Sequence, residues 1–330
     1  MFRAFPAAAA LAIAGGASCE SPQPCAFELD PGVETLWGAD QLVRDLRLNA
    51  TDVFWLVDQF LDGWSLETVA KDGTQPLVSP LTADDRVGAY AISSSTLFWS
   101  RDLGLFAAPL DGGERASLLD GTEVTAMVVA GDFLYYAVAF SSRPVEGIAR
   151  LDLRTGQEEQ LVDEAQAGSP YYLHVVDEDL FWMSNGRIWR LRLDGASEPE
   201  LLIPGDAYGM AVSAGVVYWT DPASGTVKRL ELDSQAPELV AQVDGGPIDV
   251  AADDRFVYWT ARENRASETY QHGTVARRAL SLAEPIEVLA EGQCSPRDVT
   301  ADSRAVYWTQ GYPIEGSGSH MLGRISRWRR

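Results

Sequence analysis

Short hydrophobic runs recur along the chain at intervals of about 42 residues. Each recurrence has two apolar positions two residues apart, then polar or glycine residues, then an apolar residue followed by two aromatic residues. Apolar positions with a period of two, a turn, and a β-branched or aromatic run together predict a strand–turn–strand unit. The aromatic pairs are Phe54-Trp55, Phe98-Trp99, Tyr135-Tyr136, Phe181-Trp182, Tyr218-Trp219, Tyr258-Trp259 and Tyr307-Trp308.

Two further strands follow each aromatic pair. A glycine opens the third strand, which often carries an apolar residue and, two positions later, an arginine, as in Ile188 and Arg190. A fourth apolar run comes after the next turn, for example residues 200–203. Four short antiparallel strands per repeat are typical of a β-propeller blade. The sequence therefore predicts an all-β, seven-bladed β-propeller of four-stranded antiparallel blades, with six or eight blades as the alternative counts.

The two ends of the repeat region complement each other. The last repeat stops after its third strand at Arg330, and an additional apolar run, residues 33–37, precedes the first complete repeat. We expect this N-terminal strand to complete the last blade, because pairing it there closes the ring and removes an exposed strand edge.

The first 18 residues have a different character. They combine Arg3, a short alanine-rich apolar stretch and the small residues Gly16-Ala17-Ser18. This order is typical of a secretory signal peptide, and the apolar stretch is shorter than the roughly 20 residues that span a bilayer.

Cys19 follows this segment directly, so the N-terminus resembles a bacterial lipoprotein signal. The resemblance implies a lipid on Cys19, and Glu20 in the next position implies sorting to the outer membrane, on its periplasmic or surface-facing side. Secretion as a soluble protein is the alternative. The expected organisation is a signal peptide at 1–18, a lipid-anchored tether at 19–26 and a single propeller domain at 27–330.

Composition narrows the function classes. The chain has 330 residues, 46% of them hydrophobic, and a formal net charge of −22. The apolar content excludes intrinsic disorder. The acidic excess argues against nucleic-acid binding, because a polyanion needs a cationic surface.

The aromatic motif also carries a family resemblance. Residues 218–221 read Tyr-Trp-Thr-Asp, and residues 258–260 and 307–309 are close copies. These repeats resemble the YWTD propellers of lipoprotein-receptor ectodomains, the TolB- and NHL-type propellers and, most of all, the YWT-repeat lipoproteins of bacterial envelopes. The resemblance implies binding of proteins or polymers and no catalysis. YWTD propellers usually have six blades, whereas this chain has seven copies of the repeat.

Few residues point to catalysis. The histidines are His174, His272 and His320, and none has a second histidine close in sequence. The metal-binding spacings C-x-x-C and H-E-x-x-H are absent, as are the G-x-S-x-G elbow and the P-loop. His174 falls in a predicted innermost strand, where a core or channel-lining position is the simplest interpretation.

One face of the predicted propeller gathers candidate contact residues. The loop between the second and third strands is long in blades 3, 6 and 7, at residues 137–146, 260–272 and 309–322. The innermost strands begin on the same face. Long loops on a rigid scaffold often carry function, and Tyr and Arg are favoured contact residues. The candidate ligand-binding residues are Arg44, Asp45, Tyr171, Tyr172, Tyr208, Asp249, Arg262, Tyr270, His272, Arg297, Asp298, Tyr312 and His320.

Three of these residues, Asp45, Asp249 and Asp298, occupy one repeat position and should surround the central channel. Carboxylates in that arrangement are weak candidates for Ca²⁺ ligands, since Ca²⁺ takes 6–8 oxygen ligands. Otherwise we expect no cofactor.

Two functional hypotheses follow. The first is a monomeric, non-catalytic binding or scaffold module at the cell envelope that recognises a protein, peptide or glycan through the long-loop face. The second is a metal-assisted lyase or hydrolase with its site at the mouth of the channel.

The cysteines give a direct test of the lipoprotein prediction. If Cys19 carries the lipid, Cys25 and Cys294 remain as a pair in an oxidising compartment, and we predict a disulfide between them. A thiol assay on the denatured, unreduced mature protein should then find no free thiol, whereas two free thiols would contradict the pairing.

Overall fold

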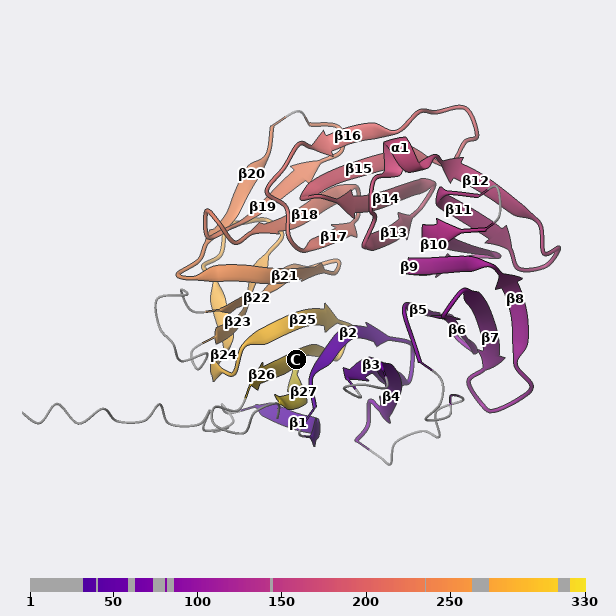
Figure 1. Ribbon diagram of the computed structural model, residues 1–330. Helices are drawn as coiled ribbons and strands as arrows, with labels where there is room; N and C mark the ends of the chain where they lie inside the picture. Colours follow the sequence, from indigo (N-terminus) through magenta and orange to yellow (C-terminus); the bar gives the residue numbers. More distant parts are fainter. Residues whose placement is uncertain are drawn as a thin grey trace, which may run out of the picture.

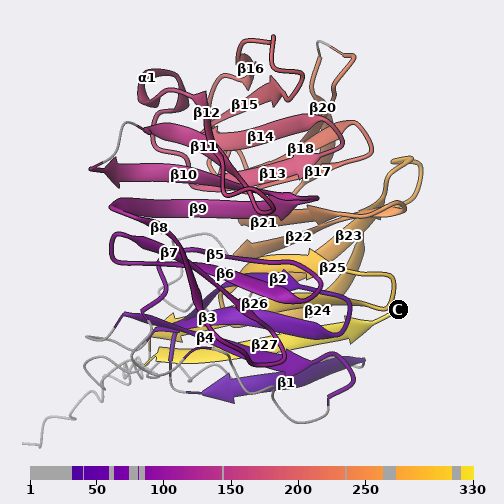
Figure 2. The same ribbon diagram turned by 90° about the vertical axis from the view of Figure 1, so that its right-hand side faces the viewer.

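Seven antiparallel sheets surround a central opening in the computed structural model of the protein (Figures 1 and 2). The structure describes residues 32–39, 41–58, 63–73, 81, 86–142, 145–234, 236–262, 273–313 and 321–330. The side chains of residues 140, 312, 313, 321 and 322 are outside this description. The predicted seven-bladed β-propeller is confirmed.

Each blade is a meander whose strands run from the central opening outwards. The innermost strands are β2 (Val43–Leu48), β5 (Tyr90–Ile92), β9 (Thr122–Ala130), β13 (Tyr172–Val176), β17 (Met210–Ser213), β21 (Gly246–Ala252) and β25 (Pro296–Ala301). The second strands are β3 (Asp52–Asp58), β6 (Thr96–Arg101), β10 (Phe133–Ser141), β14 (Asp179–Ser184), β18 (Val216–Asp221), β22 (Phe256–Arg262) and β26 (Ala305–Pro313).

The outer half of each blade follows the same order. The third strands are β4 (Trp64–Ala70), β7 (Gly104–Pro109), β11 (Gly147–Asp152), β15 (Arg187–Arg192), β19 (Thr226–Glu231), β23 (Gly273–Ala279) and β27 (Met321–Arg329). The outermost strands are β8 (Ala116–Asp120), β12 (Glu158–Val162), β16 (Glu200–Ile203), β20 (Glu238–Gln242), β24 (Glu287–Gln293) and β1 (Val33–Ala39). The first blade has three strands among the described residues, and the other six have four.

The N-terminal strand closes the ring as predicted. β1 pairs antiparallel with β27, so the last blade combines the first and last strands of the chain. Glu34 of β1 accepts a hydrogen bond from Nε of Arg327 at 2.8 Å, and its other oxygen lies 2.9 Å from Nε of Arg329. Lys71 and Asp302 form an ion pair of 2.7 Å between the first and last blades. Closure thus combines a strand ladder with ion pairs.

The aromatic pairs form the contacts between blades. Seven clusters of buried hydrophobic side chains each join two neighbouring blades. Every cluster contains the first aromatic residue of one blade and the second aromatic residue of the next, as with Tyr218 and Trp259, or Tyr258 and Trp308. Successive side chains of a strand point to opposite faces of the sheet, so one pair serves both neighbours.

The Thr of the YWT motif links neighbouring innermost strands. Thr220 is fully buried, and its Oγ1 accepts a hydrogen bond from N of Gly209 at 2.8 Å in its own blade. The same hydroxyl donates to the carbonyl of Ile248 in the next blade at 2.9 Å. Thr260 and Ser100 make equivalent pairs of bonds. Because each hydroxyl both accepts and donates, it couples two blades without leaving a buried polar atom unpaired.

Two of the predicted long loops are shorter in the structure. In blade 3, residues 137–141 extend β10, with Val138 opposite Gly147 and Ser141 opposite Thr122. The prediction of a loop over 137–146 is therefore wrong, because the hydrophobic run Ala137-Val138-Ala139-Phe140 continues the strand. In blade 7, β26 and β27 remain paired as far as residues 313 and 321. The residues between them, 314–320, and residues 263–272 of blade 6 lie outside the described residues.

Helix is almost absent from the described residues. The single helix, α1 (Glu164–Ala167), lies in the connection from the third to the fourth blade, and Asp163 caps it by accepting a hydrogen bond from N of Gln166 at 2.8 Å. Within the described part of the chain, no helix has the length and apolar character needed to cross a membrane.

Ring closure by β1 can be tested by truncation. Deleting residues 27–40 should lower the melting temperature by about 10 °C or more, because it removes the β1–β27 ladder, buried Val33 and the Glu34 ion pairs, which together contribute several kcal/mol. Differential scanning calorimetry would measure the change. A protein that lacks only residues 1–26 is the control. A near-native melting temperature for the protein without residues 27–40 would refute closure by β1.

Candidate functional site

The innermost strands all begin on one face of the ring, where the central opening is visible (Figure 1). Figure 2 shows the same face edge-on, on the side opposite the C-terminus. Positions that are equivalent in the repeat therefore lie at the same depth around the opening. Eight of the candidate residues stand at or just before the start of an innermost strand, namely Arg44, Asp45, Tyr171, Tyr172, Tyr208, Asp249, Arg297 and Asp298.

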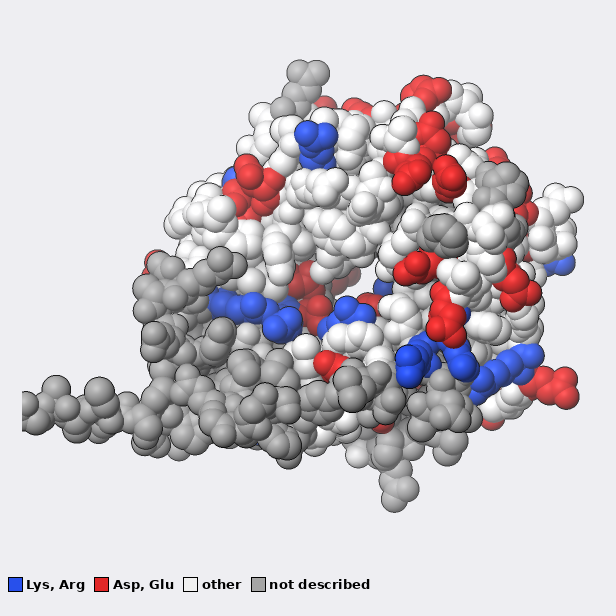
Figure 3. Space-filling view, viewed as in Figure 1, with Lys and Arg blue, Asp and Glu red and all other residues white. Residues whose placement is uncertain are grey.

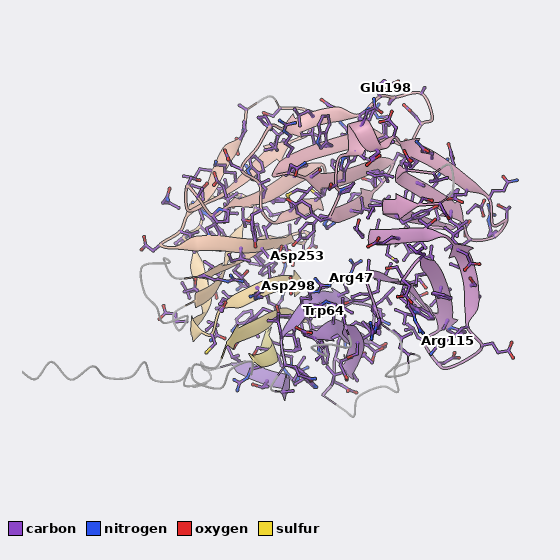
Figure 4. The ribbon with its side chains drawn as sticks, viewed as in Figure 1. Arg47, Trp64, Arg115, Glu198, Asp253 and Asp298 are labelled. Atoms are coloured by element: carbon purple, nitrogen blue, oxygen red, sulfur yellow. The ribbon has the colours of Figure 1, made fainter. Side chains whose placement is uncertain are left out.

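A bulge in β2 fixes the geometry of the first blade at this site. The register of β2 against β3 shifts between Arg44 and Arg47, and Asp45 has a positive φ of 55°. The Asp45 carboxylate accepts a hydrogen bond from Nε of Arg47 at 3.0 Å. Nη1 of Arg47 donates to the carbonyl of Met127 in blade 3 at 3.1 Å, and the hydroxyl of Tyr90 donates to the carbonyl of Asp45. Arg47 thus connects the first and third blades (Figure 4).

Asp298 and Asp249 are also bonded within the ring. Asp298 accepts a hydrogen bond from the hydroxyl of Thr309 at 2.9 Å, and its backbone N–H donates to the same hydroxyl at 3.0 Å. A backbone hydrogen bond from Asp45 also reaches the Asp298 carboxylate. Asp249 accepts a hydrogen bond from N of Val299 at 2.9 Å, across the interface between blades 6 and 7. These carboxylates therefore act first as links between blades.

Burial changes the ionisation of both carboxylates. Asp249 is only 9% exposed, and burial, assisted by the nearby Asp298 charge, raises the pKa of Asp249 to about 8. Burial also raises the pKa of Asp298. For Arg47, burial alone would lower the pKa, but the Asp45 carboxylate together with Tyr90 and Tyr172 outweighs it, and the net effect is a raised pKa. At neutral pH Asp249 is therefore mainly protonated and Arg47 is charged.

Tyr172 and His174 face these groups from the fourth blade. Burial raises the pKa of Tyr172 well above its ordinary value, and the carboxylates of Asp249, Asp298 and Asp45 add to the effect. Burial and the Arg47 charge lower the pKa of His174 to about 4, and His174 also hydrogen-bonds the backbone of Met210. His174 is therefore neutral at pH 7.

Aromatic side chains form part of the rim. Tyr171 is 44% exposed and Tyr208 is 53% exposed, on the neighbouring fourth and fifth blades. The rings of Tyr171 and Tyr172 meet edge-on with centroids 5.6 Å apart. On the first blade, the guanidinium of Arg44 lies 3.8 Å from the ring centroid of Trp64, a cation–π contact that holds this arginine at the rim.

Charged and uncharged side chains lie on different sides of this rim. Figure 3 shows the face hollowed at its centre, with blue and red side chains meeting beside the hollow and white surface opposite them. The described residues contain no group of three or more His, Cys, Asp or Glu side chains placed to hold a metal ion. Ca²⁺ binding by Asp45, Asp249 and Asp298 stays a prediction.

The remaining candidates are placed differently. Arg262 ends β22, and Tyr312 lies in β26, where only its backbone is described. Tyr270, His272 and His320 lie outside the described residues, as do Cys19 and Cys25. Cys294 is buried between β24 and β25 and is disulfide-bonded. The assignment of Cys25 as its partner stays a prediction.

Sequence reasoning missed three residues of this site, namely Arg47, Tyr90 and Trp64. Arg47 follows Asp45 by two positions and occupies a repeat position that is apolar in four of the other copies, His174 in one and Thr300 in one. Tyr90 is the one hydroxylated residue at a position that is otherwise filled by aliphatic residues or Met. These departures from the repeat could have marked Arg47 and Tyr90 as site residues. Their contact with Asp45, however, depends on ring closure and on the β2 bulge.

The similarity of this protein to known proteins extends to the fold alone. No protein-family model matches the chain, and no curated protein sequence matches it. The WD40 β-propeller domain of Doa1 is similar in structure, with 14% identity, a TM-score of 0.59 and coverage of 89% of this chain and 97% of that one. U3-55K has 11% identity and a TM-score of 0.61, covering 89% of this chain and 98% of its own.

A third similar structure is the extracellular domain of a protein assigned as a one component system of B. thetaiotaomicron. It shares 11% identity with a TM-score of 0.59, and the match covers 91% of this chain and 40% of that chain. At these identities the likeness establishes a β-propeller, and the YWTD resemblance stays a prediction.

The protonated state of Asp249 predicts a pH-dependent stability. Its pKa is about 8 in the folded protein against 3.8 as the ordinary value, so the native state retains a proton that the unfolded chain releases. The retained proton stabilises the native state fully below about pH 4, and this contribution to the free energy of unfolding is lost as the pH rises towards 8. Asp249→Asn keeps a neutral acceptor for N of Val299, so near pH 8 it should raise the free energy of unfolding by about 2–4 kcal/mol.

Urea denaturation at pH 5 and pH 8 measures this difference. The variant should gain most at pH 8 and little at pH 5, while the exposed control Asp111→Asn should change stability equally at both. A loss of stability in Asp249→Asn that is the same at both pH values would contradict the protonated state of Asp249.

Proposed function

We propose that this propeller is a non-catalytic binding or scaffold module of the cell envelope, and that it binds its partner on the face where the innermost strands begin. One observation carries this proposal. Among the described residues, only Tyr171 and Tyr208 are aromatic side chains with large exposure, and they lie on neighbouring blades at the rim of the central opening. The aromatic pairs of the repeats are buried between blades, so the exposure of these two tyrosines serves no packing role.

Surface tyrosines and arginines on one face favour recognition, because an aromatic ring offers a large contact area and its hydroxyl offers a hydrogen bond. Arg44 and Arg297 stand at the equivalent repeat position in the first and last blades. Strands β22 and β26 end on this face, and the proposal assigns Arg262, Tyr270, His272, Tyr312 and His320 to the same surface. The partner is a protein, peptide or glycan, and the propeller binds it as a monomer.

The alternative is a metal-assisted lyase or hydrolase at the mouth of the channel. The bonding of the carboxylates favours a binder over this alternative. Asp45 is paired with Arg47, Asp249 with N of Val299, and Asp298 with Thr309. General acid–base catalysis needs a carboxylate directed at the substrate, whereas these carboxylates already accept hydrogen bonds from groups of the ring itself.

The location of the protein belongs to the same proposal. The N-terminal signal and a lipid on Cys19 would place the propeller at the bacterial outer membrane, with a secreted soluble form as the alternative. A tether of residues 19–26 would allow the proposed binding face to turn away from the membrane surface.

Site-specific photo-crosslinking in cells tests the binding face. A photoreactive phenylalanine analogue at Tyr208 should give a defined covalent adduct, because this side chain is exposed at the proposed contact surface. The control position is Asp194, exposed in the turn between β15 and β16 on the opposite face of the ring. Immunoblotting for the full chain measures both.

The same analogue at Tyr171 should give the same adduct as at Tyr208. Adducts from Asp194 at equal yield, or no adduct from either tyrosine position, would contradict binding on this face.

A further inference from the structure

The mouth of the channel is built from two layers of repeat-equivalent residues. The outer layer consists of Arg44, Gly88, Thr125, Tyr171, Tyr208, Ile248 and Arg297. The layer one residue deeper consists of Asp45, Ala89, Ala126, Tyr172, Gly209, Asp249 and Asp298. Read around the ring, charged residues gather on blades 6, 7 and 1, small residues on blades 2 and 3, and tyrosines on blades 4 and 5. The mouth therefore has a charged side and an aromatic side.

The charged side is balanced within itself. The Arg44 guanidinium interacts with the charges of Asp45 and Asp298, while Arg47 pairs directly with Asp45. The charge of Arg297 likewise acts on Asp298. Asp249 keeps its proton at neutral pH, so the three arginines stand with the carboxylates of Asp45 and Asp298 and with Asp58, whose charge also acts on Arg44. Both signs occur at each of blades 7 and 1.

The presence of both positive and negative groups at the mouth determines which ligand charge can bind there. A cationic group entering the mouth would meet Arg44 and Arg297 in the outer layer, and an anionic group would meet Asp45 and Asp298 directly beneath them. Burial of an unpaired charge is costly, so neither ion is favoured. A ligand with neutral groups that both donate and accept hydrogen bonds suits guanidinium and carboxylate neighbours equally, and hydroxyl groups have this property.

The aromatic side supplies the complementary surface. Tyr171 and Tyr208 present exposed rings, and the Tyr171 hydroxyl is held by a backbone hydrogen bond from Gly186. Tyr172 faces the three carboxylates from this side. A ligand held here would contact apolar ring faces on one side and hydrogen-bonding groups on the other.

We propose that the mouth of the channel binds a neutral sugar ring, with its hydroxyls on the Arg44–Asp45 and Arg297–Asp298 pairs and its C–H face against Tyr171 and Tyr208. The inference rests on the proposed binding face and selects glycan from its partner classes. A peptide and a charged sugar are the competing ligands.

Ligand-observed NMR by saturation transfer tests this with the purified full chain. The neutral probes are glucose, galactose, mannose and N-acetylglucosamine, and the charged counterparts are glucuronate and glucosamine. At least one neutral sugar should bind with a Kd on the order of 1 mM. Tyr208→Ala and Asp45→Asn should each weaken this binding about tenfold, an effect equal to 1.4 kcal/mol.

Leu239→Ala is the matched control, because Leu239 is exposed on the outermost strand β20 and distant from the mouth. It should leave the affinity unchanged, and equal melting temperatures would show that all variants are folded. Binding of none of the four neutral sugars, or exclusive binding of glucuronate or glucosamine, overturns the inference. If Tyr208 still crosslinks to a partner in cells, only the sugar class has failed; if crosslinking is lost too, the proposed binding face has failed with it.

Discussion

The hydroxyl that follows the aromatic pair is the contact on which the innermost strands depend at three of the seven blade interfaces, those after Ser100, Thr220 and Thr260. A buried Thr or Ser accepts a hydrogen bond from its own innermost strand and donates one to the innermost strand of the next blade. A short hydroxyl side chain suits this place, because it can reach backbone groups of two neighbouring innermost strands at once. Without a bond on both sides, a fully buried hydroxyl would cost about 1–3 kcal/mol.

The aromatic pair, on the two preceding residues of the same strand, fills the gap between neighbouring blades. Blades splay apart as they extend outwards, and the widening gap needs large side chains. The alternation of the strand sends one ring to each neighbour, so every interface receives a Tyr or Phe from one blade and a Trp or Tyr from the next. In blades 2, 5 and 6, three consecutive residues of one strand thus provide both apolar contacts and a polar contact between blades.

Because the second strands make these contacts between blades, the residues at the starts of the innermost strands can differ from blade to blade. Thr260 holds the inner strand of blade 6, so Asp249 can extend across to N of Val299 in addition. In blade 7 the pattern changes, because Thr309 donates to Asp298 of its own blade and leaves that carboxylate in contact with blade 1. The polar cluster at the mouth therefore grows out of departures from the repeat on three adjacent blades, on a scaffold that the repeat itself makes rigid.

The repeat period, the alternation of apolar residues and the unpaired run at residues 33–37 were sufficient to predict seven blades and ring closure, because strand pairing and blade packing follow local periodicity. The sequence also placed Asp45, Asp249 and Asp298 at one level, since equivalent repeat positions must share a depth. It could not predict that β10 continues beyond residue 137, because glycine spacing alone does not show where a hairpin ends. Only the tertiary structure brought Arg47 of blade 1 to Met127 of blade 3 and set Tyr172 opposite the carboxylates. Those contacts join residues 77 or more positions apart around a closed ring, and nothing in the periodic pattern marks the β2 bulge that directs Arg47.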